Sequence, residues 1–365
     1  MTREERARLG ALRTKCGVWV AVSLLTVGAA SLVVSSPAQA LTITPIFSTG
    51  TNLTVDAAIT AAINRIDGLY SNPVTIPVTF TFTPAVDMNG NPTYLGANLE
   101  PVYTYTYHQY TTALTADSTA NPSNTPLSTA VANLDVGNDA NGANNVVIDF
   151  GHALMLSQYG LQAPAPGTPT INLNSAWQST GTPFSFTTTV TNTQYDAIGV
   201  LEHELDEVLG GGGAGSLLPE ALASSCTGPS PGPFCNTFGA TDLYRYSAPG
   251  TPSFTTSSSA TAYLSLDGGL NSIAGFNQGA APPAGCPGGD YGDFAPNGTG
   301  AGQLIQNACN TTGSYEAYTT SSPEFAMEEA IGWDPATPAP VPVPGTLAML
   351  GASLFGLGAL RRHQR

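Results

Sequence analysis

The segment 195–209 constrains this chain more than any other. Apolar residues recur there at helical spacing, at positions 198, 201, 205, 208 and 209, and four consecutive glycines follow. The pattern predicts a helix that packs against a core. The same helix carries His203, Glu204 and Glu207. An apolar helix should not bury three such groups near one another without an ion that compensates their charge.

The spacing of these three residues indicates a metal site. His203 and Glu207 are four residues apart, so they lie about 40° apart around the helix axis and can reach one ion. Glu204 is turned by about 100° from His203, which places it beside such an ion rather than on it. This is the geometry of the HExxH zinc hydrolases, with a glutamate in place of the second histidine.

The chain resembles the zincin metalloproteases beyond this pentapeptide. Residues 195–210 read YDAIGVLEHELDEVLG, like the apolar active-site helix of that family. The chain is similar to secreted bacterial members in which DLFRYS-like and SLDGG-like stretches follow; here these are DLYRYS at 242–247 and SLDGG at 265–269. The resemblance implies an α+β fold over 41–338: a zincin-like metalloprotease domain with an active-site helix, a mixed sheet and a loop-rich C-terminal part.

The third metal ligand must come from elsewhere in the chain. Glu207 stands where HExxH has its second histidine, and Gly213 stands where the longer HExxHxxGxxH pattern has its last. The resemblance implies a later ligand, and in related sequences with an intact HExxH we expect a histidine before an aromatic residue near 289–294. We therefore predict Asp293, with Asp242 as second choice. Zn²⁺ is the expected metal, although one imidazole and two carboxylates also suit Mn²⁺, Fe²⁺ or Ca²⁺.

The resemblance implies a metal-dependent endopeptidase that acts on a protein or peptide substrate. Glu204 would be its catalytic residue, activating a metal-bound water against the peptide carbonyl. The alternative is a non-catalytic, degenerate zincin: a surface or biofilm-matrix protein that binds a cation or an envelope partner. A third class is a polysaccharide-active enzyme with paired carboxylates, but no pattern in the chain defines such a pair.

The two ends of the chain have the composition of sorting segments. Residues 1–40 combine a basic stretch, an apolar run and an Ala-Gln-Ala site, which predicts a secretory signal peptide; a retained membrane anchor is the alternative. Residues 339–365 combine a proline-rich spacer, an apolar stretch and a basic end, and resemble the PEP-CTERM sorting tail, with Val343 in place of its glutamate.

These segments imply partners and an address. We expect processing by signal peptidase and by exosortase, with transient membrane contact through the C-terminal tail. The expected location is beyond the inner membrane, at the cell envelope or extracellular surface of a Gram-negative bacterium.

The segment between the two ends is strongly acidic. Residues 41–338 hold 23 Asp and Glu against two arginines, a formal charge of −21. Such a segment repels phosphate backbones, so we expect no binding to nucleic acid.

Four cysteines fall in the same segment, an even number suited to an oxidising compartment. We expect disulfides between Cys226 and Cys235 and between Cys286 and Cys309, although the sequence allows three connectivities. A zinc site of four cysteines is the alternative, but neither pair has the usual close spacing.

Periodicity and turn residues also predict the other elements. Helices are expected at 55–70 with Thr54 as N-cap, at 105–116 and at 323–331. Strands are expected at 74–82, interrupted near Pro77, and at 146–150 and 170–173, with strand-like pieces at 184–190, 243–246 and 263–266. Asp267 should lie in a turn. We expect His108 and His152 to be structural, and Arg245 to pair with a buried carboxylate.

Overall fold

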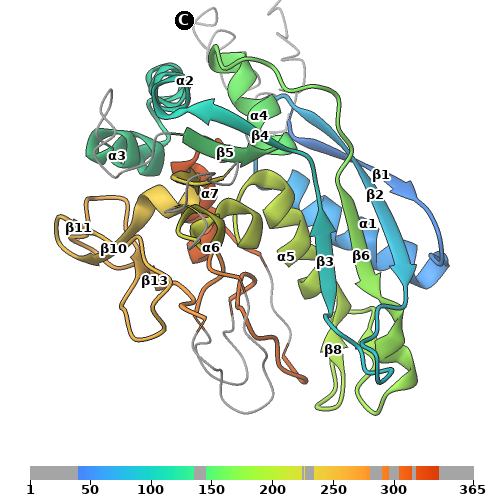
Figure 1. The fold of residues 1–365 in the computed structure, drawn as a ribbon. Coiled ribbons are helices and arrows are strands. Elements are labelled where there is room, and N and C mark those ends of the chain that lie inside the picture. Colours follow the sequence, from blue (N-terminus) through green and yellow to red (C-terminus); the bar gives the residue numbers. More distant parts are fainter. Residues whose placement is uncertain are drawn as a thin grey trace, which may run out of the picture. The chain divides into compact units, whose positions relative to one another are not determined.

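Helix α5 (Ala197–Leu209) is the element around which the fold is arranged. In the computed structural model it packs against α1 (Leu53–Asp67), β3 (Gly96–Leu99), α4 (Phe150–Leu156) and β6 (Thr170–Asn174) (Figure 1). The structure describes residues 40–134, 145–223, 226, 234–279, 290–295, 304–314 and 318–336.

The predicted central helix is confirmed. It begins two residues later than expected, because Tyr195–Asp196 form strand β8. The Asp196 side chain caps it by accepting the Ile198 N–H at 3.0 Å. At the other end Gly210 adopts a left-handed conformation with φ 115°, which glycine does without strain, and its N–H reaches the last helical carbonyls. Every residue of α5 except His203 is buried.

A mixed sheet lies beside α5 in the strand order β1-β2-β6-β3. Strands β1 (Thr42–Phe47) and β2 (Thr75–Thr83) are parallel, as are β2 and β6, whereas β3 is antiparallel to β6. Within the described residues β3 has no second sheet partner, so it is an edge strand next to α5 (Figure 1). The expected interruption at Pro77 is wrong: β2 is continuous there, because pairing with β6 starts only at Thr79.

The loop-rich C-terminal part forms a second, smaller sheet in the order β11-β10-β12-β13. Helix α5 lies between this sheet and the first one (Figure 1). With helices and with parallel and antiparallel strands in the described residues, the chain has the predicted α+β class.

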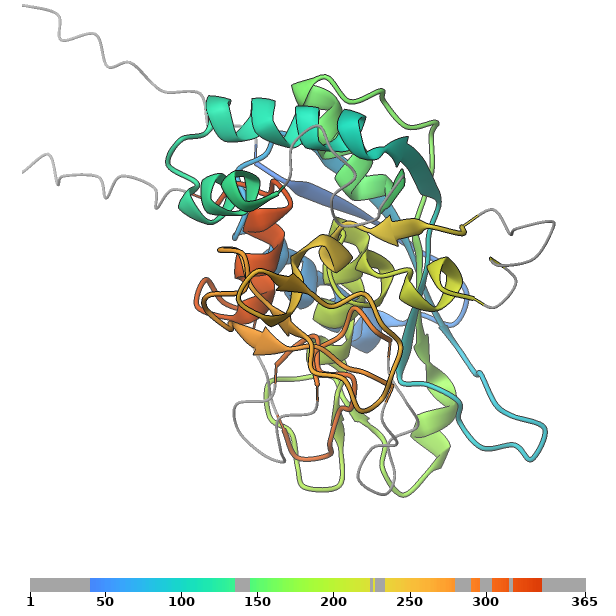
Figure 2. The ribbon, with the colours of Figure 1, turned by 60° about the vertical axis from the view of Figure 1, so that its left-hand side comes forward.

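Most predicted elements are present, with shifted bounds. The helix at 105–116 is α2 (Tyr107–Ala120) and the last helix is α7 (Pro323–Ala330), which packs against α3 (Thr125–Asn133) (Figure 2). The N-cap of α1 is Asn52 rather than Thr54, because the Asn52 side chain accepts the first free N–H groups of the helix.

In the segment 243–246 the strand prediction is partly wrong, since the 3-10 helix η5 (Thr241–Tyr244) precedes β10 (Arg245–Ala248). The strand predicted at 146–150 is β5 (Asn145–Asp149). The other elements are β4 (Val102–Thr106), η1 (Ser157–Tyr159), η2 (Ser175–Ser179), β7 (Phe184–Ser185), η3 (Gly213–Gly215), α6 (Leu218–Ala221), β9 (Thr237–Gly239), β11 (Thr251–Pro252), β12 (Tyr263–Leu264) and β13 (Ala274–Gly275).

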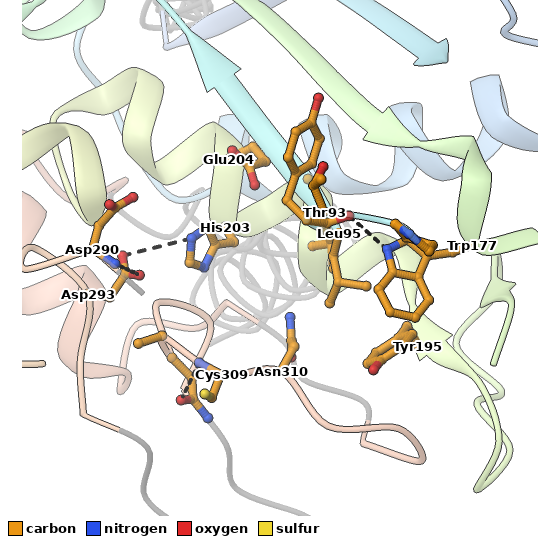
Figure 3. Close-up of a pocket in the computed structure, with 16 residues that line it drawn as sticks. Thr93, Leu95, Trp177, Tyr195, His203, Glu204, Asp290, Asp293, Cys309 and Asn310 are labelled. Atoms are coloured by element: carbon orange, nitrogen blue, oxygen red, sulfur yellow. Dashed lines mark hydrogen bonds and ion pairs between the residues drawn. The ribbon is translucent and has the colours of Figure 1, made fainter. Parts of the chain in front are cut away.

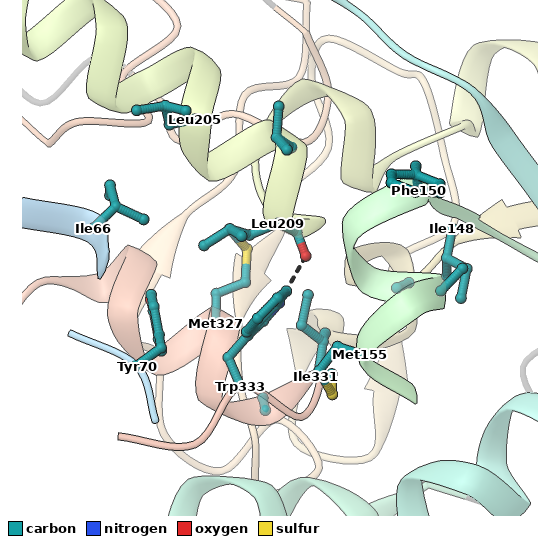
Figure 4. Packing of buried hydrophobic residues seen from close by; sticks show 14 of the residues in the cluster. Ile66, Tyr70, Ile148, Phe150, Met155, Leu205, Leu209, Met327, Ile331 and Trp333 are labelled. Carbon is teal, nitrogen blue, oxygen red and sulfur yellow. Dashed lines mark hydrogen bonds between the residues drawn. The ribbon is translucent and has the colours of Figure 1, made fainter. Parts of the chain in front are cut away.

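The main hydrophobic core fixes the far side of α5. Leu205 and Leu209 pack there with Met327 of α7 and with Trp333, which is fully buried (Figure 4). The indole N–H of Trp333 donates to the Leu209 carbonyl at 2.8 Å. Apolar packing and this hydrogen bond therefore anchor the end of α5 that follows His203 and Glu207.

The predicted disulfide between Cys226 and Cys235 is confirmed. Cys309 is also disulfide-bonded, and its expected partner Cys286 lies outside the described residues. The segments 1–39 and 337–365 lie outside them too, so the predicted sorting signals have no structural description. Within the part that is described, no helix has the length and apolarity that crossing a membrane requires.

Many carboxyl groups are buried, although residues 41–338 contain only two arginines and no lysine. Asp117 in α2 is fully buried and accepts a hydrogen bond from the Asn121 side chain at 2.7 Å. Burial raises the pKa of Asp117 to about 7. Such a group stays protonated in the folded protein at a pH where the unfolded chain has already lost the proton.

This carboxyl should make the protein less stable as the pH rises from about 4 to about 7. Between these values the folded state binds more protons than the unfolded state, so its contribution to stability is present at low pH and lost on alkalinisation. The Asp117→Asn variant should therefore show a flatter decline, by at most about 1.4 kcal/mol per pH unit. Urea unfolding at several pH values measures this.

Asp87→Asn is the matched control. Asp87 lies in an exposed turn, and hydrogen bonds from Asn91 and Asn89 lower its pKa. Its contribution is therefore lost only in more acidic solution, and the slope above pH 5 should not change. An unchanged slope for Asp117→Asn would contradict the assignment.

Candidate metal centre

Three predicted residues come together at one point. The His203 Nε2 atom lies 3.6 Å from Glu207 Oε1 and 3.9 Å from Asp293 Oδ1, and the three ligand atoms lie within 4.8 Å of one another. Two ligands that each bind zinc at about 2.1 Å are at most about 4.2 Å apart. Figure 3 shows His203 facing Asp293 across the pocket. The two distances from His203 are within that limit, and the 4.8 Å bound on the third pair requires only a small movement of a carboxylate for all three to bind one small divalent cation.

The imidazole of His203 is oriented by the backbone. Its Nδ1 atom lies 2.8 Å from the carbonyl oxygen of Ile305. A carbonyl only accepts hydrogen bonds, so Nδ1 carries the proton in the neutral ring and Nε2 has the free lone pair. That lone pair is on the side of Glu207 and Asp293, and a hydrogen bond from the other ring nitrogen is typical of metal-binding histidines.

The carboxylate of Asp293 has an unused oxygen in a buried place. The residue is 4% exposed, and its Oδ2 atom accepts the Asp290 N–H at 3.1 Å. Its Oδ1 atom, which faces His203, makes no hydrogen bond within the described part of the chain. A buried carboxylate oxygen without a partner is rare, and a cation at this point would satisfy it.

A buried arginine holds the turn that carries Asp293. Arg245 is 0% exposed, and its guanidinium donates to the carbonyls of Tyr291 and Asn277. The Asn277 N–H in turn donates to the Asp293 carbonyl at 2.8 Å, and its side-chain amide donates to the Asp290 carbonyl at 2.9 Å. The ligand turn is therefore fixed through its backbone from β10 and from the segment after β13.

The predicted pairing of Arg245 with a buried carboxylate is wrong. Among the described residues Arg245 forms no ion pair; its guanidinium lies 4.3 Å from the ring centre of Phe276. Burial lowers the pKa of Arg245 to about 10, and the charge of Asp242 counters part of that shift. Its guanidinium donates instead to the carbonyl oxygens of Tyr291 and Asn277, which lie closer than the carboxylate of any described residue.

Asp242, the second choice for the third ligand, is used elsewhere. It is fully buried, and its two oxygens accept hydrogen bonds from the Ser216 hydroxyl at 2.6 Å and from the Leu217 and Gly239 N–H groups at 2.9 Å. These bonds tie together the segment after α5. The structure therefore brings Asp293 to His203, and Asp242 stays outside the cluster.

Glu204 lies beside the cluster and not in it, as the helix geometry predicts. It is 5% exposed and lines the pocket together with His203 (Figure 3). Strand β3 passes close to it: a Cβ atom on Gly96 would lie 2.4 Å from Glu204 Oε1 and 2.7 Å from Val200 Cγ1. Only glycine allows this approach of the edge strand to α5.

Sequence reasoning missed the part played by Asp290. A Cβ atom on Gly213 would lie 2.5 Å from Asp290 Oδ2 and 2.6 Å from Glu207 Oε1, so these two oxygens are at most 5.1 Å apart. The carboxylates thus fill the space of a side chain at position 213. A histidine at position 213 would clash with Glu207 of α5 and with Asp290 of the later turn.

The electrostatics of the cluster favour a cation. Burial raises the pKa values of Glu204 and Asp293 well above their ordinary range, and repulsion from Glu207 adds to both shifts. Burial alone would lower the pKa of His203, but the carboxylates around it raise that pKa well above its usual value. The residues that line the pocket include no lysine or arginine. A divalent cation would supply the missing positive charge.

The site opens into a pocket of about 450 Å³.

The two other histidines among the described residues do not line the pocket or join the cluster, as expected. His152 is fully buried, with Nε2 2.8 Å from the Ile331 carbonyl, and His108 is exposed on α2. Asp267 accepts the Asn271 N–H in the predicted turn.

Comparison with protein-family models, with curated proteins and with solved structures finds no match to this chain. The interpretation of the site therefore rests on the chain's own residues and geometry.

The geometry predicts that the chain binds one divalent cation through His203, Glu207 and Asp293. Each of Glu207→Gln and Asp293→Asn removes one anionic ligand, so we expect at least a tenfold weaker affinity for Zn²⁺, in line with about 1.4 kcal/mol per tenfold change. Isothermal titration with zinc and metal analysis of the purified protein measure this.

Asp87→Asn is the matched control, because Asp87 is an exposed carboxylate in a turn and takes no part in the ligand cluster. Its affinity for zinc should equal that of the unchanged protein. Zinc binding that survives both ligand substitutions at full strength would refute the site.

Proposed function

We propose that this chain is a zincin-type metal-dependent endopeptidase. The observation that carries the proposal is the convergence of His203, Glu207 and Asp293 on one point, with Glu204 beside them in a pocket. The setting supports it as well, since a buried helix carries the motif and a mixed sheet places an antiparallel edge strand beside that helix.

Each residue of the site has a separate task in this proposal. His203, Glu207 and Asp293 hold the cation, which when bound polarises the substrate carbonyl and makes water more acidic. Glu204 accepts the proton of the attacking water and later donates a proton to the departing amine. Burial raises the pKa of Glu204 and a bound cation would lower it again, so the balance of the two lets this carboxylate both accept and release a proton.

The ligand set also sets limits on activity. Two carboxylates and one imidazole leave less positive charge on a metal than three neutral imidazoles do. Water at such a centre is less acidic, so hydrolysis at neutral pH should be slower. Oxygen ligands also broaden the choice of metal, so Mn²⁺, Fe²⁺ and Ca²⁺ are candidates besides Zn²⁺.

The surroundings suit an extended polypeptide as substrate. The pocket is bordered by the start of β3, and the outer edge of that strand has no sheet partner within the described residues. Unpaired backbone groups on an edge strand can bind an extended peptide by adding a strand. We propose in addition that residues 1–40 and 339–365 direct export and sorting to the cell envelope, as their composition suggests.

Substitution of Glu204 by glutamine tests the catalytic assignment. The variant keeps the shape of the side chain but cannot accept a proton, so we expect peptidase activity to fall by about a hundredfold to ten-thousandfold. Zinc content should not change, because Glu204 lies outside the ligand cluster. Cleavage of casein and metal analysis measure the two effects, and loss of zinc together with activity would assign Glu204 to the metal instead.

The second candidate function is a cation-binding surface protein without catalysis, and Glu207 in place of histidine favours it. Glu207→His separates the two. In an enzyme, the variant should bind zinc more tightly and raise an activity that the unchanged protein already has. If the unchanged protein has no activity and the variant gains it, the chain is a degenerate enzyme and the peptidase proposal fails.

A further inference from the structure

The side of the pocket away from the two aspartates is apolar. Four residues form it, and we call them the aromatic wall: Leu95, Trp177, Tyr195 and Val200. Val200 is buried, while the other three are partly exposed and pack against it and its neighbours. Figure 3 shows Leu95, Trp177 and Tyr195 grouped across the pocket from Asp290 and Asp293.

The wall belongs to a small hydrophobic cluster that is separate from the main core. The buried members of this cluster are Leu173, Phe184, Ala197 and Val200. Its aromatic rings at the pocket remain partly open to solvent although burying them would be favourable. An apolar surface inside a pocket with a polar side is typical of a ligand-binding site.

The two rings of the wall are held rigidly. The Trp177 N–H donates to the Tyr94 carbonyl at 2.7 Å, so the polar end of the indole is used inside the protein. The rings of Trp177 and Tyr195 pack edge to face, with centres 5.1 Å apart at 70°. The wall therefore presents fixed apolar surface and needs little ordering on binding.

The aromatic wall lies close to the proposed reaction centre. Val200 and Glu204 are four residues apart on α5, so they share a face of the helix about 6 Å apart along its axis. Both come close to Gly96 of the edge strand. An extended peptide advances about 3.3 Å per residue, so the separation of about 6 Å is less than two residues. A large side chain next to the peptide bond at His203 and Glu204 therefore reaches the wall.

The opposite side of the pocket disfavours acidic substrates. Asp290 and Asp293 line it, Glu204 lies between them and the wall, and the lining residues include no lysine or arginine. An acidic side chain beside the cleaved bond would meet these carboxylates, and the −21 charge of residues 41–338 adds to the repulsion.

We propose, on the basis of the peptidase function above, that the aromatic wall is the specificity subsite of the enzyme. It binds a large apolar or aromatic side chain of the substrate directly beside the cleaved peptide bond. Substrates with glycine or an acidic residue on both sides of the bond are poor.

The test measures kcat/KM for internally quenched peptides that carry Phe, Leu, Gly or Asp on either side of the cleaved bond. We expect Phe and Leu on one side to exceed Gly by about tenfold or more, the range seen for apolar pockets, and Asp to be worst. Trp177→Ala and Tyr195→Ala should bring the ratio of Phe to Gly close to one. Cleavage without this preference, or a ratio that both variants retain, overturns the proposal.

Three further variants separate specificity from stability. Tyr195→Phe keeps the ring and should keep the ratio. Phe186→Ala removes a ring from the same cluster that does not line the pocket, so it should also keep the ratio. Trp177→Phe retains a smaller ring and should give an intermediate ratio, which replaces the alanine result if that variant does not fold.

A binding measurement separates failure of this proposal from failure of the peptidase function. The probes are the blocked peptides acetyl-Gly-Phe-Gly-amide and acetyl-Gly-Asp-Gly-amide, titrated against tryptophan fluorescence of the full chain. If no peptide is cleaved but the Phe peptide binds and Trp177→Ala abolishes its signal, the subsite stands and the peptidase function fails. If neither peptide binds and none is cleaved, both fail.

Discussion

The structure depends on how a buried helix compensates its own negative charge. Helix α5 buries four carboxyl groups within six residues, Glu202, Glu204, Asp206 and Glu207. Their charge is compensated in three different ways. Glu202 pairs with Arg65 of α1, one of the two arginines between residues 41 and 338. Asp206 accepts the Tyr318 hydroxyl at 2.5 Å, and burial raises its pKa to about 7, so it keeps a proton near neutral pH. Among the described residues, Glu204 and Glu207 have neither an arginine nor a lysine in reach. Without a metal, protonation of Glu204 and of His203 relieves their charge, and a divalent cation would relieve it with both carboxylates ionised. The candidate site thus follows from the charge balance of the helix as well as from its motif.

The same constraint explains why a late turn belongs to the site. A side chain at position 213 would be the natural third ligand after two residues of α5, but the chain has glycine there and its space is filled by Glu207 and Asp290. The turn that brings Asp290 and Asp293 belongs to no helix or named strand, and only the isolated bridges of Phe294 to Phe276 and Asn307 tie its end to neighbouring segments. Arg245 supplies that support through backbone carbonyls, and Asn277 adds two further hydrogen bonds. This gives the arginine of the DLYRYS stretch a physical role: it holds the turn that carries Asp293, the proposed third ligand.

The sequence allows some of this to be predicted and hides the rest. Helix α5 was predictable because its apolar residues keep the helical period and Gly210 ends it. His203, Glu204 and Glu207 were predictable because their relation is local, fixed by the turn of one helix. Edge strand β3 was not, since its four residues GANL show no alternation of apolar and polar side chains. The cap of α1 was misplaced by two residues because Asn52 and Thr54 have equally suitable side chains and only the backbone decides between them. The aromatic wall joins residues from four separate segments, and no single-sequence pattern records such proximity.

Two parts of the site differ in how they are held, and this bears on what a cation would do. His203 and Glu207 sit on a helix anchored by the main core, with Trp333 bonded to its last turn. Asp293 sits on a turn held mainly by hydrogen bonds to its backbone. A cation bound by all three would join the rigid element to the less regular one. Its binding energy would then go partly into fixing the turn, because ligands from a loop must be ordered before they bind. The buried guanidinium of Arg245 reduces that cost by fixing the turn in advance. The arginine and its carbonyl partners should therefore strengthen the proposed metal binding although none of them is a ligand.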